Sequence, residues 1–215
     1  MFSRAIVCLL VSASLGLING CSQISTTKPP VSKLPVPAAT KALNWKKRQA
    51  YLAGKPSWNL QSKISLRYKD ENLIFGLKWL QRPVNLYIMQ ISNPLTGALV
   101  AKLSRDARGV SLLADNGRTY RDTDEERLLQ KQSGLKMPVK GMQYWVRGIT
   151  SPQYKVDKLV LYNAGRPQSI NQAGWKINYA SYLNNNFNSA PRKIILTRST
   201  DKVYLKVIAK NWQGI

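Results

Sequence analysis

Few side chains in this 215-residue chain are of the types needed for catalysis or metal binding. The chain contains ten carboxylates, two cysteines and no histidine. Without histidine there is no Ser-His-Asp or Cys-His nucleophile and no His-ligated metal site. Two cysteines are too few for a four-cysteine zinc site or a disulfide scaffold. The tight group of carboxylates at residues 122–126 is typical of a helix start. We therefore expect no enzymatic activity, no catalytic residue, no metal and no cofactor.

The cysteine with a clear chemical role is Cys21. Residues 1–20 have a basic residue, Arg4, followed by an apolar run, which indicates a signal peptide too short to remain as a membrane span. Its end, Leu-Ile-Asn-Gly-Cys, resembles a bacterial lipobox, in which the cysteine becomes lipid-modified. The alternative is a plain secretory signal with a chance cysteine. The lipobox predicts lipid attachment at Cys21, and several acyl chains form a stable anchor.

The residues after Cys21 predict the membrane on which the protein is anchored and a tether to its domain. By resemblance to lipoprotein sorting in enteric bacteria, a retention signal at position 22 would be Asp, and this chain has Ser22. We therefore expect a lipid-anchored protein on the periplasmic face of the outer membrane. Residues 21–38 are rich in Ser, Thr and Pro, which favours a flexible tether. Residues 39–215 are expected to form a single domain.

Hydrophobic periodicity predicts a mainly β domain. Residues 39–53 favour a helix that ends at Gly54. Later segments alternate between apolar and polar residues with close turns, and Asn116-Gly117 predicts a type I′ hairpin. This pattern favours an antiparallel sheet. The strands expected after the first one, around Ile64, are 73–81, 84–92, 98–104, 109–114, 117–121, 156–163, 167–173, 174–182, 192–199 and 202–210.

Two further helices are expected between residues 122 and 148. A capping box of Thr123 and Glu126 predicts the start of the first, and Gly134 its end. The second is expected over 140–147. Several strands are apolar on both faces, which indicates an α+β fold in which a curved sheet or barrel of about ten strands, covered by helices, could hold a ligand cavity. An ordinary filled core is the alternative.

Several landmarks follow one another along the mature chain. They are the lipobox at Cys21, Trp45, Phe75-Gly76-Leu77-Lys78-Trp79, Asn93-Pro94-Leu95, residues 115–120 (DNGRTY), 134–139 (GLKMPV), 144–148 (YWVRG), 174–179 (GWKINY) and Asn211-Trp212. No single motif is specific, but their order and spacing together are. In this order and spacing the chain resembles the LolB family of outer-membrane lipoproteins.

The resemblance implies a function and its site. Members of the family accept triacylated lipoproteins from a periplasmic LolA-like carrier and release them into the phospholipid of the outer membrane. The family fold is an open, curved antiparallel sheet or half-barrel that is covered by helices and encloses an apolar cavity for acyl chains. The resemblance therefore favours a cavity over a filled core. The candidate lining residues are Trp79, Ile88, Met89, Leu128, Leu129 and Trp145. An anchored periplasmic lipoprotein that acts as a structural or protein-interaction module, without binding lipid, is the alternative.

The resemblance also implies a membrane-delivery loop formed by Asn93, Pro94 and Leu95. Turn residues place this segment at the surface, and the family loop carries an exposed Leu at the position of Leu95. Thr96 departs from the family pattern, in which Gly directly follows the Leu.

The net charge of +23 is a separate feature. Loss of residues 1–20 removes Arg4 and no carboxylate, which leaves +22. A location outside the cytoplasm, as the lipobox predicts, disfavours nucleic acid as the partner. Three interpretations stay open, namely solubility, attraction to anionic phospholipid, and docking to an acidic carrier. We expect a monomer.

The anchor gives a first testable prediction. Replacing Cys21 by Ala should yield a soluble periplasmic protein or an uncleaved precursor, because the mature chain has no other cysteine to acylate. Mass spectrometry of the wild-type N-terminus should show a modified Cys21. An unmodified thiol there would contradict the lipobox.

Overall fold

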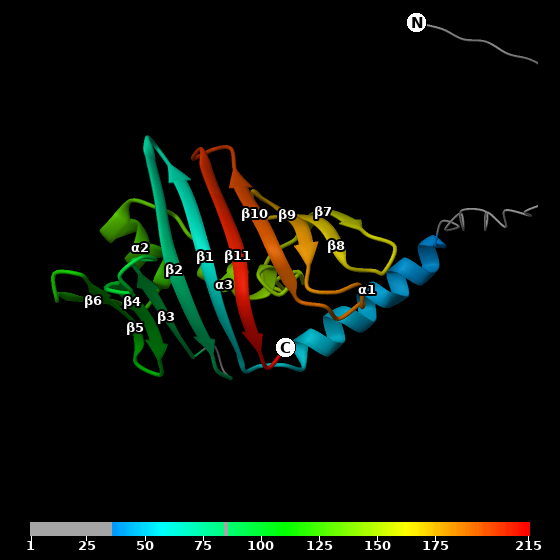
Figure 1. Ribbon diagram of the computed structural model, residues 1–215, viewed down its shortest axis with the longest axis horizontal. Coiled ribbons are helices and arrows are strands. Elements are labelled where there is room, and N and C mark those ends of the chain that lie inside the picture. The colour runs from blue at the N-terminus through cyan, green and yellow to red at the C-terminus, as the bar shows by residue number, and fades with distance from the viewer. Residues whose placement is uncertain (1–35, 84–85) are drawn as a thin grey trace, which may run out of the picture. The chain divides into compact units, whose positions relative to one another are not determined.

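The computed structural model describes residues 36–83 and 86–215, so the signal peptide, Cys21 and most of the tether lie outside the described residues. The described part contains one sheet of eleven strands, all paired antiparallel, and three helices (Figure 1). The strands are β1 (Trp58–Tyr68), β2 (Glu71–Gln81), β3 (Tyr87–Ser92), β4 (Leu99–Asp106), β5 (Gly109–Ala114), β6 (Thr119–Asp122), β7 (Val156–Leu161), β8 (Pro167–Gln172), β9 (Trp175–Tyr182), β10 (Pro191–Arg198) and β11 (Val203–Gln213).

The sheet consists of two meanders joined by one long-range pairing. Its strand order is β6-β5-β4-β3-β2-β1-β11-β10-β9-β8-β7, so every neighbour is consecutive in the chain except β1 and β11. The connection between the meanders carries helices α2 (Glu125–Ser133) and α3 (Val139–Trp145), and helix α1 (Ala38–Ala53) precedes β1. The predicted mainly β class with an open antiparallel sheet and helices is confirmed.

One face of the sheet is apolar and buried. Because strand side chains alternate between faces, register places Leu103, Met89, Trp79 and Leu60 side by side on the same face. Each of these side chains is at most 8% exposed. Helices α2 and α3 lie behind this sheet in Figure 1, and the buried side chain of Leu128 on α2 belongs to the same apolar core.

The start of α2 differs from the predicted capping box. Asp124, not Thr123, is the N-cap, and its carboxylate accepts a hydrogen bond from the Arg127 N–H at 2.9 Å. The Asp122 carboxylate accepts from the backbone N–H groups of Thr123 and Asp124, which holds the chain in a turn for one more residue. The capping box is therefore wrong by one position. Gly134 ends the helix as predicted, with φ +71°.

The hairpin between β5 and β6 is not type I′. That turn needs positive φ at both Asn116 and Gly117, whereas Gly117 has φ +77° and Asn116 is not among the positive-φ residues. The Gly117 N–H donates to the Ala114 carbonyl and the Ala114 N–H donates to Arg118. This is a three-residue loop in which a glycine follows a tight turn, the next most common hairpin class.

Candidate functional site

The inner face of the sheet, with the helices on it, is the candidate site. Trp145 from α3 is fully buried, and its indole N–H donates to Gln172 Oε1 at 2.8 Å. Gln172 in turn donates to the backbone carbonyls of Ser151 and Tyr154. The Tyr179 hydroxyl donates to the Trp145 carbonyl at 2.9 Å. Hydrogen bonds to buried polar groups therefore fix α3 against β8 and β9.

A second aromatic group covers the other half of the inner face. Trp79 is fully buried, and its ring lies 5.1 Å from the Trp58 ring and 6.4 Å from the Tyr87 ring, centroid to centroid. The Trp79 indole N–H donates to Gln81 Oε1 at 3.2 Å. Burial strongly raises the pKa of the Tyr87 hydroxyl, with the nearby carboxylate of Glu125 adding to the shift. The Tyr87 hydroxyl is itself buried and has no hydrogen-bond partner among the described residues.

The structure brings together most, but not all, of the predicted lining residues. Trp79, Met89, Leu128 and Trp145 are buried in one core, and the partly buried Leu129 packs against it. Ile88 is 37% exposed, because it lies between two inward-facing residues of β3 and so points to the opposite face. The placement of Ile88 in the lining was wrong, and alternation within the strand is the reason.

Large aromatic side chains lie in the interior. Four tryptophans, each at most 2% exposed, occupy it: Trp58, Trp79, Trp145 and Trp175. Two hollows in the described residues lie elsewhere, one beside Asp106 and Arg121 and the other beside Tyr162 and Arg166. A cavity for acyl chains is therefore still a prediction, and it requires the helices or these side chains to move.

Arg48 ties α1 to α3 and to the β9–β10 loop. Its guanidinium is fully buried and donates to four carbonyls, those of Arg147 and Gly148 after α3 and those of Phe187 and Ser189 in the loop, at 2.5–2.8 Å. Burial lowers the pKa of Arg48 to about 10, which leaves it charged at neutral pH. A Cβ at Gly148, where φ is +71°, would lie 2.7 Å from the Arg48 guanidinium.

Arg147 connects the same two helices in the opposite direction, from the segment after α3 to the end of α1. It donates to the carbonyls of Leu52, at 2.7 Å, and Lys55, at 3.2 Å, so the segment after α3 holds the end of α1. Its guanidinium also lies 5.5 Å from the centroid of the Trp58 ring. Within the described residues, neither Arg48 nor Arg147 forms an ion pair with a carboxylate. The two arginines join α1 and α3 into one unit through backbone carbonyls.

Our sequence interpretation missed both arginines. Arg48 directly follows Lys46 and Lys47, and neither arginine was among the candidate site residues. The signal that could have found it is helical spacing, because Trp45, Arg48 and Leu52 are the buried residues of α1 and share one face.

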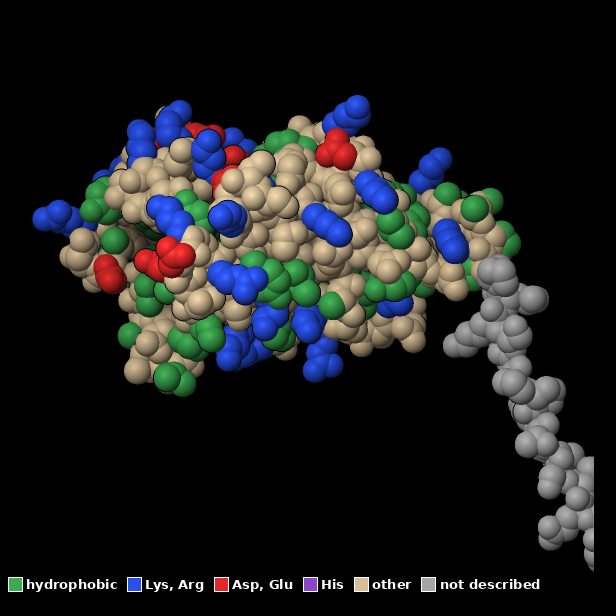
Figure 2. All heavy atoms as spheres, turned by 90° about the horizontal axis from the view of Figure 1, so that it is seen from above, with side chains coloured by type: hydrophobic (Ala, Val, Ile, Leu, Met, Phe, Trp, Pro, Cys, Tyr) green, Lys and Arg blue, Asp and Glu red, His purple; other side chains and the backbone are tan. Residues whose placement is uncertain are grey.

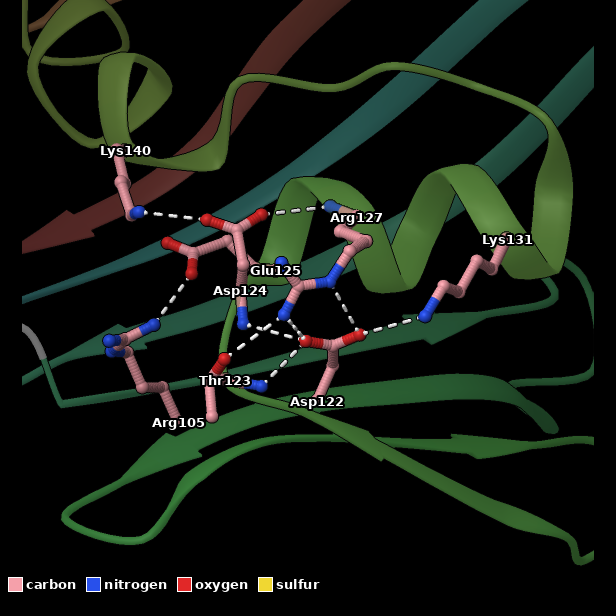
Figure 3. A network of polar contacts seen from close by, with 8 residues as sticks. All are labelled: Arg105, Asp122, Thr123, Asp124, Glu125, Arg127, Lys131 and Lys140. Atoms are coloured by element: carbon pink, nitrogen blue, oxygen red, sulfur yellow. Dashed lines mark hydrogen bonds and ion pairs between the residues drawn. The ribbon is translucent and has the colours of Figure 1, made fainter.

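Helix α2 is held by charges (Figure 3). Glu125 is buried and accepts from Arg105 at 2.6 Å, and Asp124 pairs with Lys140 on α3 at 3.0 Å. Arg127 and Lys131 both contact Asp122. A hydrogen bond from Arg127 is the main reason why the pKa of Asp122 lies well below its usual range. Hydrogen bonds from two backbone N–H groups lower this pKa further. Among the described residues there is no group of three potential metal ligands.

The predicted membrane-delivery loop carries a highly exposed leucine. Leu95 is 94% exposed. The Asn93 side-chain oxygen accepts from the N–H groups of Leu95, at 2.9 Å, and Thr96, at 3.2 Å. The Thr96 hydroxyl oxygen accepts from the Ala98 N–H at 3.2 Å, and Gly97 has φ +75°. Thr96, the departure from the family pattern, thus belongs to an ordered turn that keeps Leu95 outside.

These features define a binding fold: an open antiparallel sheet with one apolar face closed by helices. Residues 56–212 match the family model described as "Outer membrane lipoprotein LolB". The chain therefore belongs to the LolB family.

Individual relatives support membership of the same family. The chain is 30% identical over 213 residues to the outer-membrane lipoprotein LolB of Pseudomonas savastanoi pv. phaseolicola, covering 99% of this chain and 97% of the relative. It is 30% identical over 179 residues to LolB of Alkalilimnicola ehrlichii, covering 83% and 88%. A DUF1329 family protein from Desulfovibrio piger matches with a TM-score of 0.55 at 9% identity, covering 84% and 93%, which shows a shared fold.

The arginine connection gives a prediction for stability. Arg48→Met should lower the free energy of unfolding by at least about 3 kcal/mol, because charge-assisted hydrogen bonds are lost and four carbonyls lose their donor. Arg48→Lys should also destabilise, because an ammonium cannot span the same carbonyls.

The matched control is Lys47→Met, an exposed position one residue earlier on α1, which should change stability by less than about 0.5 kcal/mol. Urea unfolding followed by circular dichroism measures all three variants. Wild-type stability in Arg48→Met would show that the connection is dispensable.

Proposed function

We propose that this chain takes triacylated lipoproteins from a periplasmic LolA-like carrier and inserts them into the outer membrane by binding and transferring their acyl chains. As a member of the LolB family it is an outer-membrane lipoprotein of the lipoprotein localisation pathway, and it acts without catalysing a reaction. The observation that carries the proposal is the continuous apolar inner face of the sheet, closed by helices. We expect it to work as a monomer anchored through Cys21.

Acyl chains would have to displace what fills the interior. Helices α1 and α3 are joined by buried arginines. Helix α2 is held by the buried Leu128 and by the ion pair of the buried Glu125 with Arg105. Its other ion pairs, to Asp122 and Asp124, are partly exposed. Partly exposed ion pairs are weak and are screened by salt. We therefore propose that α2 and the segment that follows it are the cover that moves, exposing Leu128 and the sheet beneath it.

Transfer would be driven by affinity alone. Burying a CH2 group is worth about 0.8 kcal/mol, so three acyl chains represent a very large total. Each step can proceed only if the next environment binds the chains at least as well. Burial of one leucine contributes only about 1.5–3 kcal/mol, which is small beside the lipid anchor. The exposed Leu95 would therefore matter for the last step, release of cargo, and not for attachment of the protein to the membrane.

The alternative function is supported by one observation, the four buried tryptophans in the interior. An anchored interaction module would keep its tryptophans buried and bind no lipid. Uptake of a fluorescent fatty-acid probe by the delipidated protein separates the two functions, since a module of that kind would take up none.

The delivery loop gives a prediction for transfer. Leu95→Glu should keep the fold, the anchor and acceptance of cargo, but should slow release to the membrane, because a carboxylate is costly at the lipid boundary. The assay loads the purified variant with a lipoprotein, adds liposomes and measures the fraction of cargo moved. The matched control is Leu183→Glu, at a leucine 54% exposed in a different loop.

The outcomes discriminate between roles. Release from Leu95→Glu at the wild-type rate would refute a role in delivery. Failure to accept cargo would place Leu95 in the binding site or the fold instead. The control should release cargo at the wild-type rate.

A further inference from the structure

The outer face of the sheet, opposite the apolar inner face, is strongly basic. Lysines on it stand between buried neighbours: Lys78 lies between Leu77 and Trp79, and Lys206 lies between Leu205 and Val207. Strand alternation therefore points these lysines outward. The outer basic face comprises Lys63, Arg67, Lys78, Lys102, Lys176, Lys193 and Lys206.

The strand register groups these cations into adjacent rows. One row runs across four strands as Lys102, Gln90, Lys78 and Gln61. Each of the other three rows runs from β2 through β1, β11 and β10 to β9. The first row contains Gly76, Lys63, Ile208, Lys193 and Ser181, and the second contains Ile74, Ser65, Lys206, Ile195 and Asn178. The third row contains Asn72, Arg67, Tyr204, Thr197 and Lys176. These rows contain no Asp or Glu, so positive charge spans β4 to β9 without interruption.

The carboxylates lie elsewhere. Most occupy strand connections or the region of α2, where Arg105, Arg127, Lys131 and Lys140 already pair with them. Within the described residues, no ion pair involves a cation of the outer basic face. Figure 2 shows Lys and Arg side chains along the lower edge, the side of β1, β2 and β11, without Asp or Glu beside them.

The composition of this face fits a lipid surface better than a protein partner. Six of its seven cations are lysines, which are depleted in protein–protein interfaces, whereas Arg and exposed aromatic residues are enriched there. The face spans seven strands, roughly 30 Å at the usual strand spacing. It also presents aliphatic side chains, Ile74 at 54% and Ile88 at 37% exposure. Each cation near an anionic membrane raises binding by about fivefold.

We propose that the outer basic face binds the anionic phospholipid of the membrane to which the protein is anchored, and so sets the orientation of the domain on the bilayer. This proposal deepens the proposed function, and it relies on that function for the identity of the membrane. Membrane attraction would then have two parts, a broad electrostatic one from the sheet and a local apolar one from Leu95. This explains Ile88 as well, since its exposed side chain faces the lipid and not the interior.

The test measures binding to vesicles without carrier or cargo, so it can fail independently of the proposed function. The protein is the chain from residue 21 onward with Cys21→Ala, so that no acyl chain holds it on the membrane. The probes are vesicles of phosphatidylethanolamine alone, or with phosphatidylglycerol added. Binding should require phosphatidylglycerol and weaken as salt rises, because salt screens exposed charges.

The decisive variant replaces Lys63, Lys78 and Lys193 by Gln, three exposed members of the outer basic face on three strands. It should lower partitioning into anionic vesicles at least tenfold. The matched control replaces Lys46, Lys47 and Lys155 by Gln, which removes the same charge from exposed positions outside this face. The control should change partitioning less than threefold, and circular dichroism should show both variants folded.

Two results would overturn the proposal. Equal losses in the two triple variants would mean that only net charge matters. Unchanged vesicle binding in the Lys63, Lys78 and Lys193 variant, with slower acceptance of cargo from the carrier, would assign this face to an acidic protein partner instead.

Discussion

The structure depends on keeping the single apolar face of an eleven-stranded sheet away from water. Pairing of β1 with β11 joins two meanders, and every inward-facing side chain then lies on one continuous surface. Such a sheet is not stable with that face exposed, since burial of apolar area is the main favourable term in folding. The helices therefore have to close it. Any acyl chain that enters must replace the contacts that the helices and the tryptophans now make.

The helices close that face in two different ways. Arg48 and Arg147 bind backbone carbonyls and join α1 to α3 in a water-excluded place, where a lost hydrogen bond is costly. The contacts of α2 include ion pairs such as Lys140 with Asp124, whose side chains are about one-third exposed. Loss of such a pair costs less. This difference is the reason for proposing that α2 is the part of the cover that opens.

The sequence predicted the local elements well, because apolar alternation and turn residues are local signals. A strand over residues 202–210 was expected, and β11 is found at Val203–Gln213. Its pairing with β1 joins residues such as Ile64 and Val207, which no local pattern connects. Of the candidate site, Trp79 and Trp145 were predicted inside and are buried. Ile88 was misplaced because an apolar residue was assumed to face inward. Arg48 was missed because its charge suggested the surface.

We propose that acyl chains of a lipoprotein enter the interior between the sheet and its helices. Four almost fully buried tryptophans lie there, so their fluorescence reports on it directly. The measurement is quenching of intrinsic fluorescence when the protein receives a lipoprotein whose acyl chains carry bromine. We predict saturable quenching by the brominated cargo and none by the same cargo without bromine. Transfer of cargo without any quenching would show that the chains bind elsewhere and would contradict the account.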